Sequence, residues 1–375
     1  MDELFINTLI FYIFCGAAFL QLFYFLFFYL RLANYKPKEN KTSHYPPVSV
    51  IICARNEDTN LKKNLPRIFA QDYPSFEVIV VDDNSDDGTT EYLFFLAQKE
   101  PRLKRTKTGN SNRMMAGKKF PLTLGLKAAA NELILLTDAD CYPATNQWLK
   151  HMVAGYTNNS KSIVLGYGAY EKQPGSLNRR IRYETVVSAI NYLSFALAKL
   201  PYMGVGRNLS YKKEMFFNTN GFFDHREIPS GDDDLFINKV ATKHNTTIEI
   251  MPESFTYSEP KETLEDWIGQ KTRHLSTARF YKAKHKLLLG IQPISHILFW
   301  FTSLYLLSIL FVYWYVVAAA FVIRWALLRY TFSQSMNKLD EKDLKPYIEL
   351  FDIIQIAYYF RFAKAALIKT KYRWD

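Results

Sequence analysis

Cysteine is scarce in this sequence of 375 residues, and its three cysteines have no regular spacing. They stand at positions 15, 53 and 141. Their number and scatter exclude a disulfide framework, and no two have the short spacing of a zinc-binding motif. Chains without disulfides are typical of reducing compartments, so the composition indicates the cytoplasm for any part of the chain outside a membrane.

Charge is absent from one long stretch near the start. Residues 4–30 carry no charged side chain and are crowded with Phe, Leu, Tyr and Ile. A helix of this length, at roughly 1.5 Å per residue, crosses a hydrocarbon core of ~30 Å with some tilt. The residues before it are acidic rather than basic, and the run is longer than a signal peptide needs. We therefore predict a retained transmembrane anchor over residues 1–31.

Glycine and proline are missing from the middle of a second apolar block, residues 291–323. Without a turn signal, this block predicts either one long or two short transmembrane helices within residues 287–332. A third block, within residues 345–372, carries Glu349, Asp352 and Arg361. It is predicted to be a last crossing or a helix lying in the membrane interface.

The balance of charge is strongly basic, with a net charge of +11. Arg31 and Lys36 follow the predicted anchor, whereas Asp2 and Glu3 precede it. The positive-inside rule therefore predicts a multi-pass protein of the cell inner (plasma) membrane, with the chain from residue 31 onward in the cytoplasm. We attribute the excess of basic residues to a surface that faces anionic lipid. No nucleic-acid partner is expected, because no recognition-helix, zinc-finger or RNP pattern occurs.

Strand and helix patterns alternate in the soluble region, residues 46–280. Predicted strands cover 48–53, 76–81 and 133–137, and predicted helices cover 61–70, 89–98 and 121–130. Continuous apolar strands separated by helices are typical of an α/β domain with a mostly parallel sheet covered on both faces. Such sheets bind ligands beyond the carboxyl ends of their strands.

Polar side chains follow each predicted strand at the point where it ends. The first strand is followed by Ala54, Arg55, Asn56 and Glu57, and the second by a run of acids that includes Asp83. One such cluster is explained by turn chemistry or by a helix N-cap. Three clusters at successive strand ends instead predict one ligand-binding crevice. Glu57 and Asp83 are expected to accept hydrogen bonds from a nucleoside.

The third strand ends in Asp138 and Asp140, separated by one alanine. Two carboxylates in one turn can both reach a hard divalent cation, which prefers oxygen ligands. Lys118 and Lys119 are candidates to contact phosphates, although either lysine is equally well explained as a solvated helix start.

Two further segments supply candidates. Asp232, Asp233 and Asp234 precede an amphipathic helix, and a carboxylate there is suited to act as general base on an acceptor hydroxyl. A later helix has Gln270 and Arg273 on one face. Arg273 is suited to clamp a diphosphate, and Trp267 or His274 to line the path of an acceptor.

Together these motifs carry a resemblance. The series VSVIICARNE, VIVVDDNSDDGT, LILLTDAD, SGDDDL and QKTRH, in this order, resembles the family 2 inverting glycosyltransferases with a GT-A fold. Membrane-bound members of that family include the cellulose, chitin and hyaluronan synthases and ceramide glucosyltransferase. The resemblance covers residues 46–280.

The resemblance implies roles for the candidate residues. Asp83 would bind the nucleotide base, with Ala54 to Glu57 and Lys119 nearby, and Asp138 and Asp140 would hold Mg²⁺ or Mn²⁺ on the donor diphosphate. Asp232 would be the catalytic base, with Asp233 a second candidate because Gly231 replaces the family's usual glutamate.

Gln270, Arg273 and His274 would match the family's Q-x-x-R-W motif near the acceptor and the diphosphate, with Trp267 on the same helix. His274 replaces the tryptophan of that motif, which speaks against processive polymerisation.

The predicted function is therefore transfer of a sugar from a nucleotide-sugar donor, expected to be UDP-linked, to a lipid or lipid-linked glycan. One alternative is a processive polysaccharide synthase. Another is a non-catalytic membrane scaffold with a degenerate nucleotide-binding domain, and a third is a nucleotidyltransferase.

Overall fold

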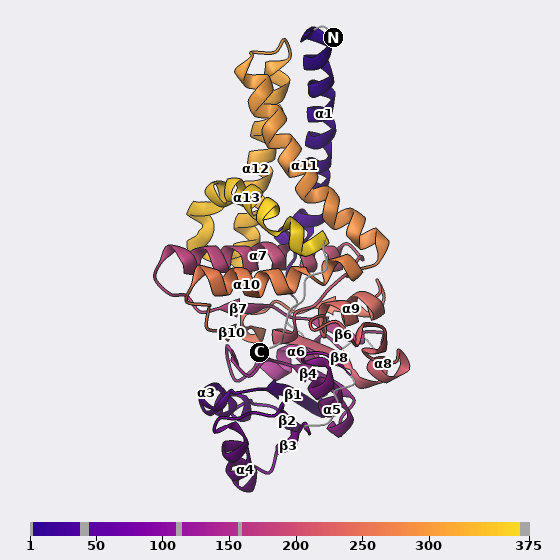
Figure 1. The fold of residues 1–375 in the computed structure, drawn as a ribbon, viewed down its shortest axis with the longest axis vertical. Coiled ribbons are helices and arrows are strands. Elements are labelled where there is room, and N and C mark those ends of the chain that lie inside the picture. Colours follow the sequence, from indigo (N-terminus) through magenta and orange to yellow (C-terminus); the bar gives the residue numbers. More distant parts are fainter. Residues whose placement is uncertain (1–2, 38–44, 110–114, 157–159, 368–375) are drawn as a thin grey trace.

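A helical stalk rises from an α/β domain in the computed structural model of the chain (Figure 1). The structure describes residues 3–37, 45–109, 115–156 and 160–367. Residues 1–2, at the start of the predicted anchor, and residues 368–372, at the end of the predicted last block, lie outside these residues.

The α/β domain is built on a sheet of seven strands in the order β3-β2-β1-β4-β8-β6-β9. The strands that match the sequence prediction are parallel neighbours: β1 (Val48–Ala54), β2 (Phe76–Asp82) and β4 (Leu133–Leu136). The sequence patterns missed four strands of this sheet, namely β3 (Leu103–Lys107), β6 (Ile163–Leu165), β8 (Leu209–Lys212) and β9 (Thr246–Ile248). Because β8 runs antiparallel to both β4 and β6, the sheet is mostly but not wholly parallel.

Helices cover both faces of this sheet, as continuous apolar strands require. One face of the strands, including Ile51 and Ile79, packs on Leu122 and Leu126. The opposite face packs on the helix that carries Leu61. The helices around the sheet are α3 (Asp58–Phe69), α4 (Thr89–Lys99), α5 (Lys119–Ala128), α6 (Trp148–Ala154), α8 (Lys213–Asn218) and α9 (Asp234–Val240). The predicted α/β class is confirmed.

A second, small sheet joins three short strands in the order β5-β10-β7: β5 (Cys141–Pro143), β10 (Thr256–Ser258) and β7 (Gly168–Tyr170). Two long helices, α7 (Ser176–Leu197) and α10 (Leu264–Leu275), lie between the sheets and the stalk (Figure 1). The described chain also contains five short 3-10 segments, of which the last connects α12 to the C-terminal helix. They are η2 (Gly206–Asn208), η3 (Phe223–His225), η4 (Pro252–Ser254), η5 (Ala278–Phe280) and η6 (Lys342–Tyr347).

Three helices of the described chain are long and apolar enough to cross a membrane. The first runs from α1 (Glu3–Phe23) through a π-helical segment, η1 (Tyr24–Tyr29), into α2 (Leu30–Ala33), and the others are α11 (Ala283–Ser308) and α12 (Trp314–Lys338). The second apolar block is thus two helices. The turn between them contains Leu310 with φ 47°, so a residue that rarely adopts this conformation makes the reversal.

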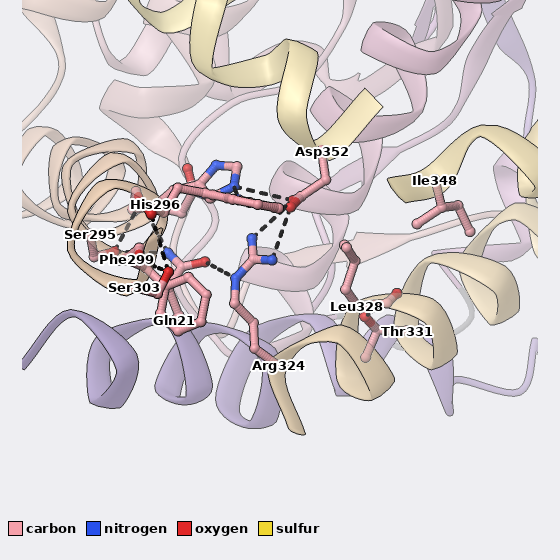
Figure 2. A network of polar contacts seen from close by, with 12 residues as sticks. Gln21, Ser295, His296, Phe299, Ser303, Arg324, Leu328, Thr331, Ile348 and Asp352 are labelled. Atoms are coloured by element: carbon pink, nitrogen blue, oxygen red, sulfur yellow. Dashed lines mark hydrogen bonds and ion pairs between the residues drawn. The ribbon is translucent and has the colours of Figure 1, made fainter. Parts of the chain in front are cut away.

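The last helix, α13 (Ile348–Leu367), is not among these three and lies across the base of the stalk (Figure 1). Figure 2 shows how it is attached: both carboxylate oxygens of Asp352 accept hydrogen bonds from Arg324 of α12, each at 2.9 Å. His296 of α11 lies 3.3 Å from the same carboxylate, and Gln21 of α1 accepts from the Arg324 Nε at 3.2 Å. This buried network joins α1, α11, α12 and α13.

Candidate active site

The ends of β1 and β2 meet in one corner, as the sequence predicted for parallel neighbours. Ala54 is buried, and its carbonyl accepts a hydrogen bond from the Asp83 amide at 2.7 Å. Asn56 has φ 57°, a conformation that asparagine tolerates, and its side chain accepts from the Asp86 amide at 3.0 Å. Arg55 is half-buried beside it. These hydrogen bonds therefore hold the loop after β1 and the loop after β2 together.

Asp83 is fully buried at the end of β2. Its carboxylate accepts a hydrogen bond from the Thr108 hydroxyl at 2.8 Å. A buried acid with fixed partners has a defined orientation, which suits recognition of a particular donor group. Glu57 lies half-buried on the loop after β1, and desolvation together with the charges of Asp140 and Asp138 raises its pKa. Glu57 is thus within electrostatic reach of the acid pair that follows β4.

Asp138 and Asp140 follow β4, and their carboxylate oxygens lie within 4.8 Å of each other and of the Cys141 sulfur. Partial desolvation and the charge of Asp138 raise the pKa of the Asp140 carboxyl. The Cys141 thiol is buried, and burial and the neighbouring acids hold its pKa well above the ordinary value. The two oxygens therefore suit a hard cation, whereas the protonated thiol does not.

Lys118 forms an ion pair with Asp138 at the start of α5. Burial disfavours the charged form of this lysine, but Asp138 and Asp232 together raise its pKa well above the ordinary value. The lysine thus responds to both carboxylates, which belong to loops far apart in the sequence.

Lys119, the residue that the sequence favoured for phosphate contact, is fully buried. Its ammonium donates hydrogen bonds to the carbonyl oxygens of Ile228 and Ser230, both at 2.5 Å. Gly117 lies against the same loop, since a Cβ there would meet the Pro229 carbonyl oxygen at 2.0 Å. The observed contacts of Lys119 fix the loop that leads into the acidic run, and its phosphate contact stays a prediction.

The three acids before α9 have different surroundings. Asp233 accepts hydrogen bonds from the Gly206 amide at 2.6 Å and from the Asp234 amide at 2.7 Å. Asp234 is buried, and it accepts from the hydroxyls of Thr277 and Tyr281. Asp232 is half-buried and has no hydrogen bond or ion pair within the described residues. Asp233 and Asp234 are thus held by the fold, and Asp232 is left available.

Helix α10 carries the predicted acceptor-side residues. Gln270 accepts a hydrogen bond from the Tyr170 hydroxyl at 3.3 Å, and Arg273 contributes to the electrostatic field at Asp138. His274 is exposed next to Arg273. Trp267 is buried and packs edge-on against Tyr358 and Phe362 of α13. The contact seen for Trp267 therefore docks α10 on α13, and its role along the acceptor path stays a prediction.

One further residue of this crevice was missed by the sequence interpretation. Arg207, in the η2 turn, stacks on the Tyr170 ring at 4.4 Å and contributes to the fields at Asp138 and Asp140. In the sequence it lies in the segment GRNLSYKKEMFFNTNGF, outside the motifs to which the sequence gave roles. The structural neighbours that define its place come from β7 and β10, which the sequence did not predict.

The mostly parallel sheet, with acids at the ends of its strands, has the GT-A architecture. The mannosyltransferase PcManGT from Pyrobaculum calidifontis, solved in complex with GDP-Man and Mn²⁺, has the same fold. It superposes with a TM-score of 0.58 at 18% sequence identity, covering 94% of this chain and 99% of that chain.

Sequence comparison identifies the family. The model "Glycosyl transferase family 2" matches residues 49–223, so the α/β part of the chain carries a domain of this family. It is 26% identical over 308 residues to the probable glycosyltransferase YdaM of Bacillus subtilis, which covers 75% of this chain and 70% of that protein. It is also 32% identical over 121 residues to a beta-monoglucosyldiacylglycerol synthase of Synechocystis sp., a match that covers 30% of this chain and 25% of that protein.

Proposed function

We propose that this chain transfers a sugar, with inversion, from a UDP-linked donor to a hydroxyl group of a lipid or lipid-linked glycan. The observation that carries the proposal is the free carboxylate of Asp232 in the same electrostatic site as Asp138. A carboxylate that the fold has not engaged is suited to accept a proton. Glycosyl transfer to a hydroxyl needs a base for the hydroxyl proton and a cation for the diphosphate. Asp232 and the nearby acid pair would supply them.

Donor binding begins at the corner formed by β1 and β2. The fixed carboxylate of Asp83 accepts a hydrogen bond from the base, and residues 54–57 border the nucleoside. Asp138 and Asp140 would hold Mg²⁺ or Mn²⁺, because paired carboxylate oxygens match the preference of these ions. When bound, the ion neutralises charge on the donor diphosphate. Arg273 supplies a second positive charge for the same group.

The chemical step is a single in-line displacement. Asp232 removes the proton from the acceptor hydroxyl while the hydroxyl oxygen attacks the anomeric carbon of the donor. The bond between that carbon and the diphosphate oxygen breaks, and the nucleoside diphosphate leaves with the bonding electrons. Arg273 stabilises the charge that develops on it. One displacement from the opposite side inverts the anomeric configuration.

A lipid acceptor and a cytoplasmic crevice are supported by the ends of the spanning helices. Basic residues gather at the domain end of the stalk, including Arg31 in α2, Lys282 and Lys284 at the start of α11, and Lys338 at the end of α12. The turn at 309–313 has none, and the exposed Tyr313, Trp314 and Tyr315 border it. Basic residues favour the cytoplasmic side, and such aromatic residues favour an interface. The protein would thus be a multi-pass inner-membrane enzyme with its α/β domain on the cytoplasmic side.

The Synechocystis relative is named as a synthase of monoglucosyldiacylglycerol, a glycolipid, and this name also favours a lipid acceptor.

A binding screen tests the proposal. Detergent-solubilised protein is titrated with UDP- and GDP-linked sugars by calorimetry, with and without Mn²⁺. One UDP-linked sugar should bind, and Mn²⁺ should increase its affinity. Absence of binding for every donor would contradict the proposal. Asp72→Asn is a suitable control variant, since Asp72 is an exposed acid that pairs with Lys150 on the surface.

A further inference from the structure

We propose that Arg207 is an additional binding residue for the donor and that its guanidinium contacts the phosphate oxygens of the nucleoside diphosphate. This inference rests on the function proposed above. It adds a residue to the site, because none of the sequence motifs assigned a role to Arg207.

The backbone around Arg207 is held in place by its two neighbours. Gly206 donates its amide to Asp233 at 2.6 Å, next to the proposed base. The buried Asn208 side chain donates to the carbonyl oxygens of Tyr167 and Ser254 and accepts from the Trp148 indole at 3.0 Å. The turn is therefore rigid at both ends, and Arg207 projects from a fixed base.

The guanidinium itself is also positioned. Its two terminal nitrogens donate to the Ser258 hydroxyl at 3.1 Å and to the Gly168 carbonyl oxygen at 3.0 Å. The group stacks on the Tyr170 ring. Gly168 leaves room for this approach, since a Cβ there would lie 3.1 Å from the Arg207 Cβ and 3.3 Å from its Nε, a tight contact. These contacts orient the group without neutralising its charge.

No carboxylate of the described chain lies within ion-pair distance of Arg207. This sets it apart from the more deeply buried Arg182 and Arg324, which are each paired with acids at 2.9 Å or less. An arginine that makes no direct ion pair keeps its charge available to a ligand, and a planar guanidinium suits an anion. The structure therefore indicates an anionic ligand for this partly buried side chain.

The surroundings identify the anion as the donor diphosphate. Asp138 and Asp140 lie close enough for the charge of Arg207 to act on their carboxyl groups. Tyr170, on whose ring Arg207 stacks, donates its hydroxyl to Gln270, on the helix that carries Arg273. We expect the donor diphosphate to lie between Arg273 and the cation held by the acid pair. In that position its phosphate oxygens would contact Arg207. A planar guanidinium with several N–H donors matches phosphate oxygens better than an ammonium does.

The test compares Arg207→Met and Arg207→Lys with the wild-type protein, using UDP, GDP and UMP as calorimetric probes in Mn²⁺. Arg207→Met should weaken binding of the diphosphate about 30-fold and UMP by less than about threefold. Arg207→Lys should lie between, because it keeps the charge and loses the planar geometry. Retained UMP affinity shows that the variant is folded. Arg105→Met, at an exposed arginine on the edge strand β3, is the matched control.

Equal diphosphate affinity in Arg207→Met and wild type would overturn this inference alone. A variant with unchanged diphosphate affinity but a higher KM for a phosphate-bearing lipid acceptor would also overturn it. The anion that Arg207 binds would then belong to the acceptor. Failure of the wild-type protein to bind either diphosphate would overturn the proposed function together with the inference.

Discussion

The two groups of enclosed charges in this protein are built in opposite ways. In the helical bundle, Arg324 and Asp352 make two parallel hydrogen bonds, and both side chains are less than 10% exposed (Figure 2). In the crevice, Asp232 and Arg207 have no ion-pair partner within the described chain. The bundle network is electrically complete, whereas the crevice has charges of both signs that need a ligand.

This difference separates structure from chemistry. A buried ion pair that satisfies itself joins helices and needs nothing from solution. Charged groups that the fold orients without an ion-pair partner are available to bind a substrate. Their partial desolvation strengthens the electrostatic interaction with it. Substitutions in the crevice should therefore change catalysis more than stability, and substitutions in the bundle should do the reverse.

The largest effect is expected for Asp232→Asn. Loss of the base should lower the rate of sugar transfer by about 10²- to 10⁴-fold, with nucleotide affinity unchanged. Asp233→Asn is the informative neighbour, because Asp233 is engaged by two backbone amides and should retain measurable transfer. The rate is measured as release of nucleoside diphosphate. An active Asp232→Asn together with an inactive Asp233→Asn would reverse the assignment.

The next largest effect is expected for Asp140→Asn. Removing one carboxylate of the pair should abolish the gain in nucleotide affinity that Mn²⁺ gives and lower transfer by about 100-fold. Calorimetry with Mn²⁺ and with excess chelator measures the gain. Cys141→Ala serves as control, since a protonated buried thiol should not be a ligand. An Mn²⁺ response that survives in Asp140→Asn and is lost in Cys141→Ala would contradict the assignment of ligands.

Breaking the bundle network should affect stability instead. Asp352→Asn leaves the Arg324 charge buried and should lower the free energy of unfolding by about 3–5 kcal/mol. The double variant Arg324→Met with Asp352→Leu removes both charges and should be closer to wild type. Thermal unfolding in detergent gives the order of the three proteins. Sugar transfer per folded molecule should change by less than about twofold. A loss of kcat without a loss of stability would contradict the structural role of this network.

The smallest effect concerns pH. Glu249 is buried outside the crevice, and burial raises its pKa to about 7. The folded state therefore favours the protonated form, so this contribution to stability is present at low pH and lost as pH rises through about 7. Thermal stability of the wild-type protein should fall between pH 5.5 and pH 8 relative to Glu249→Gln. Identical pH dependence in the two proteins would contradict this.

The sequence was sufficient for the parts of the fold whose signal is local. Apolar runs identified β1, β2 and β4, and the polar residues at their ends identified the corner that holds Asp83 and Asp138. Parallel neighbours bring their carboxyl ends together, so strand assignment alone predicted a shared crevice. The ordered motifs then gave the family, which the comparisons confirm.

Other features depend on contacts that no local pattern reveals. β6, β7 and β10 are three residues each, too short for a periodic signal. The turn at Leu310 has no turn residue to mark it. Arg207 is defined by partners about 40 to 50 residues away on those same short strands. Lys119 showed the opposite problem, because a lysine at a helix start gave no sign that two carbonyl oxygens already held it.

The central claim is tested most directly by transfer itself. Purified protein in lipid vesicles is incubated with Mn²⁺ and the labelled nucleotide sugar that it binds, and the lipid phase is extracted. The account predicts that label enters the lipid phase with one nucleoside diphosphate released per sugar, and that the new bond has the inverted anomeric configuration. Label that stays in the aqueous phase across neutral and anionic lipids, release of pyrophosphate, or a retained configuration would contradict it.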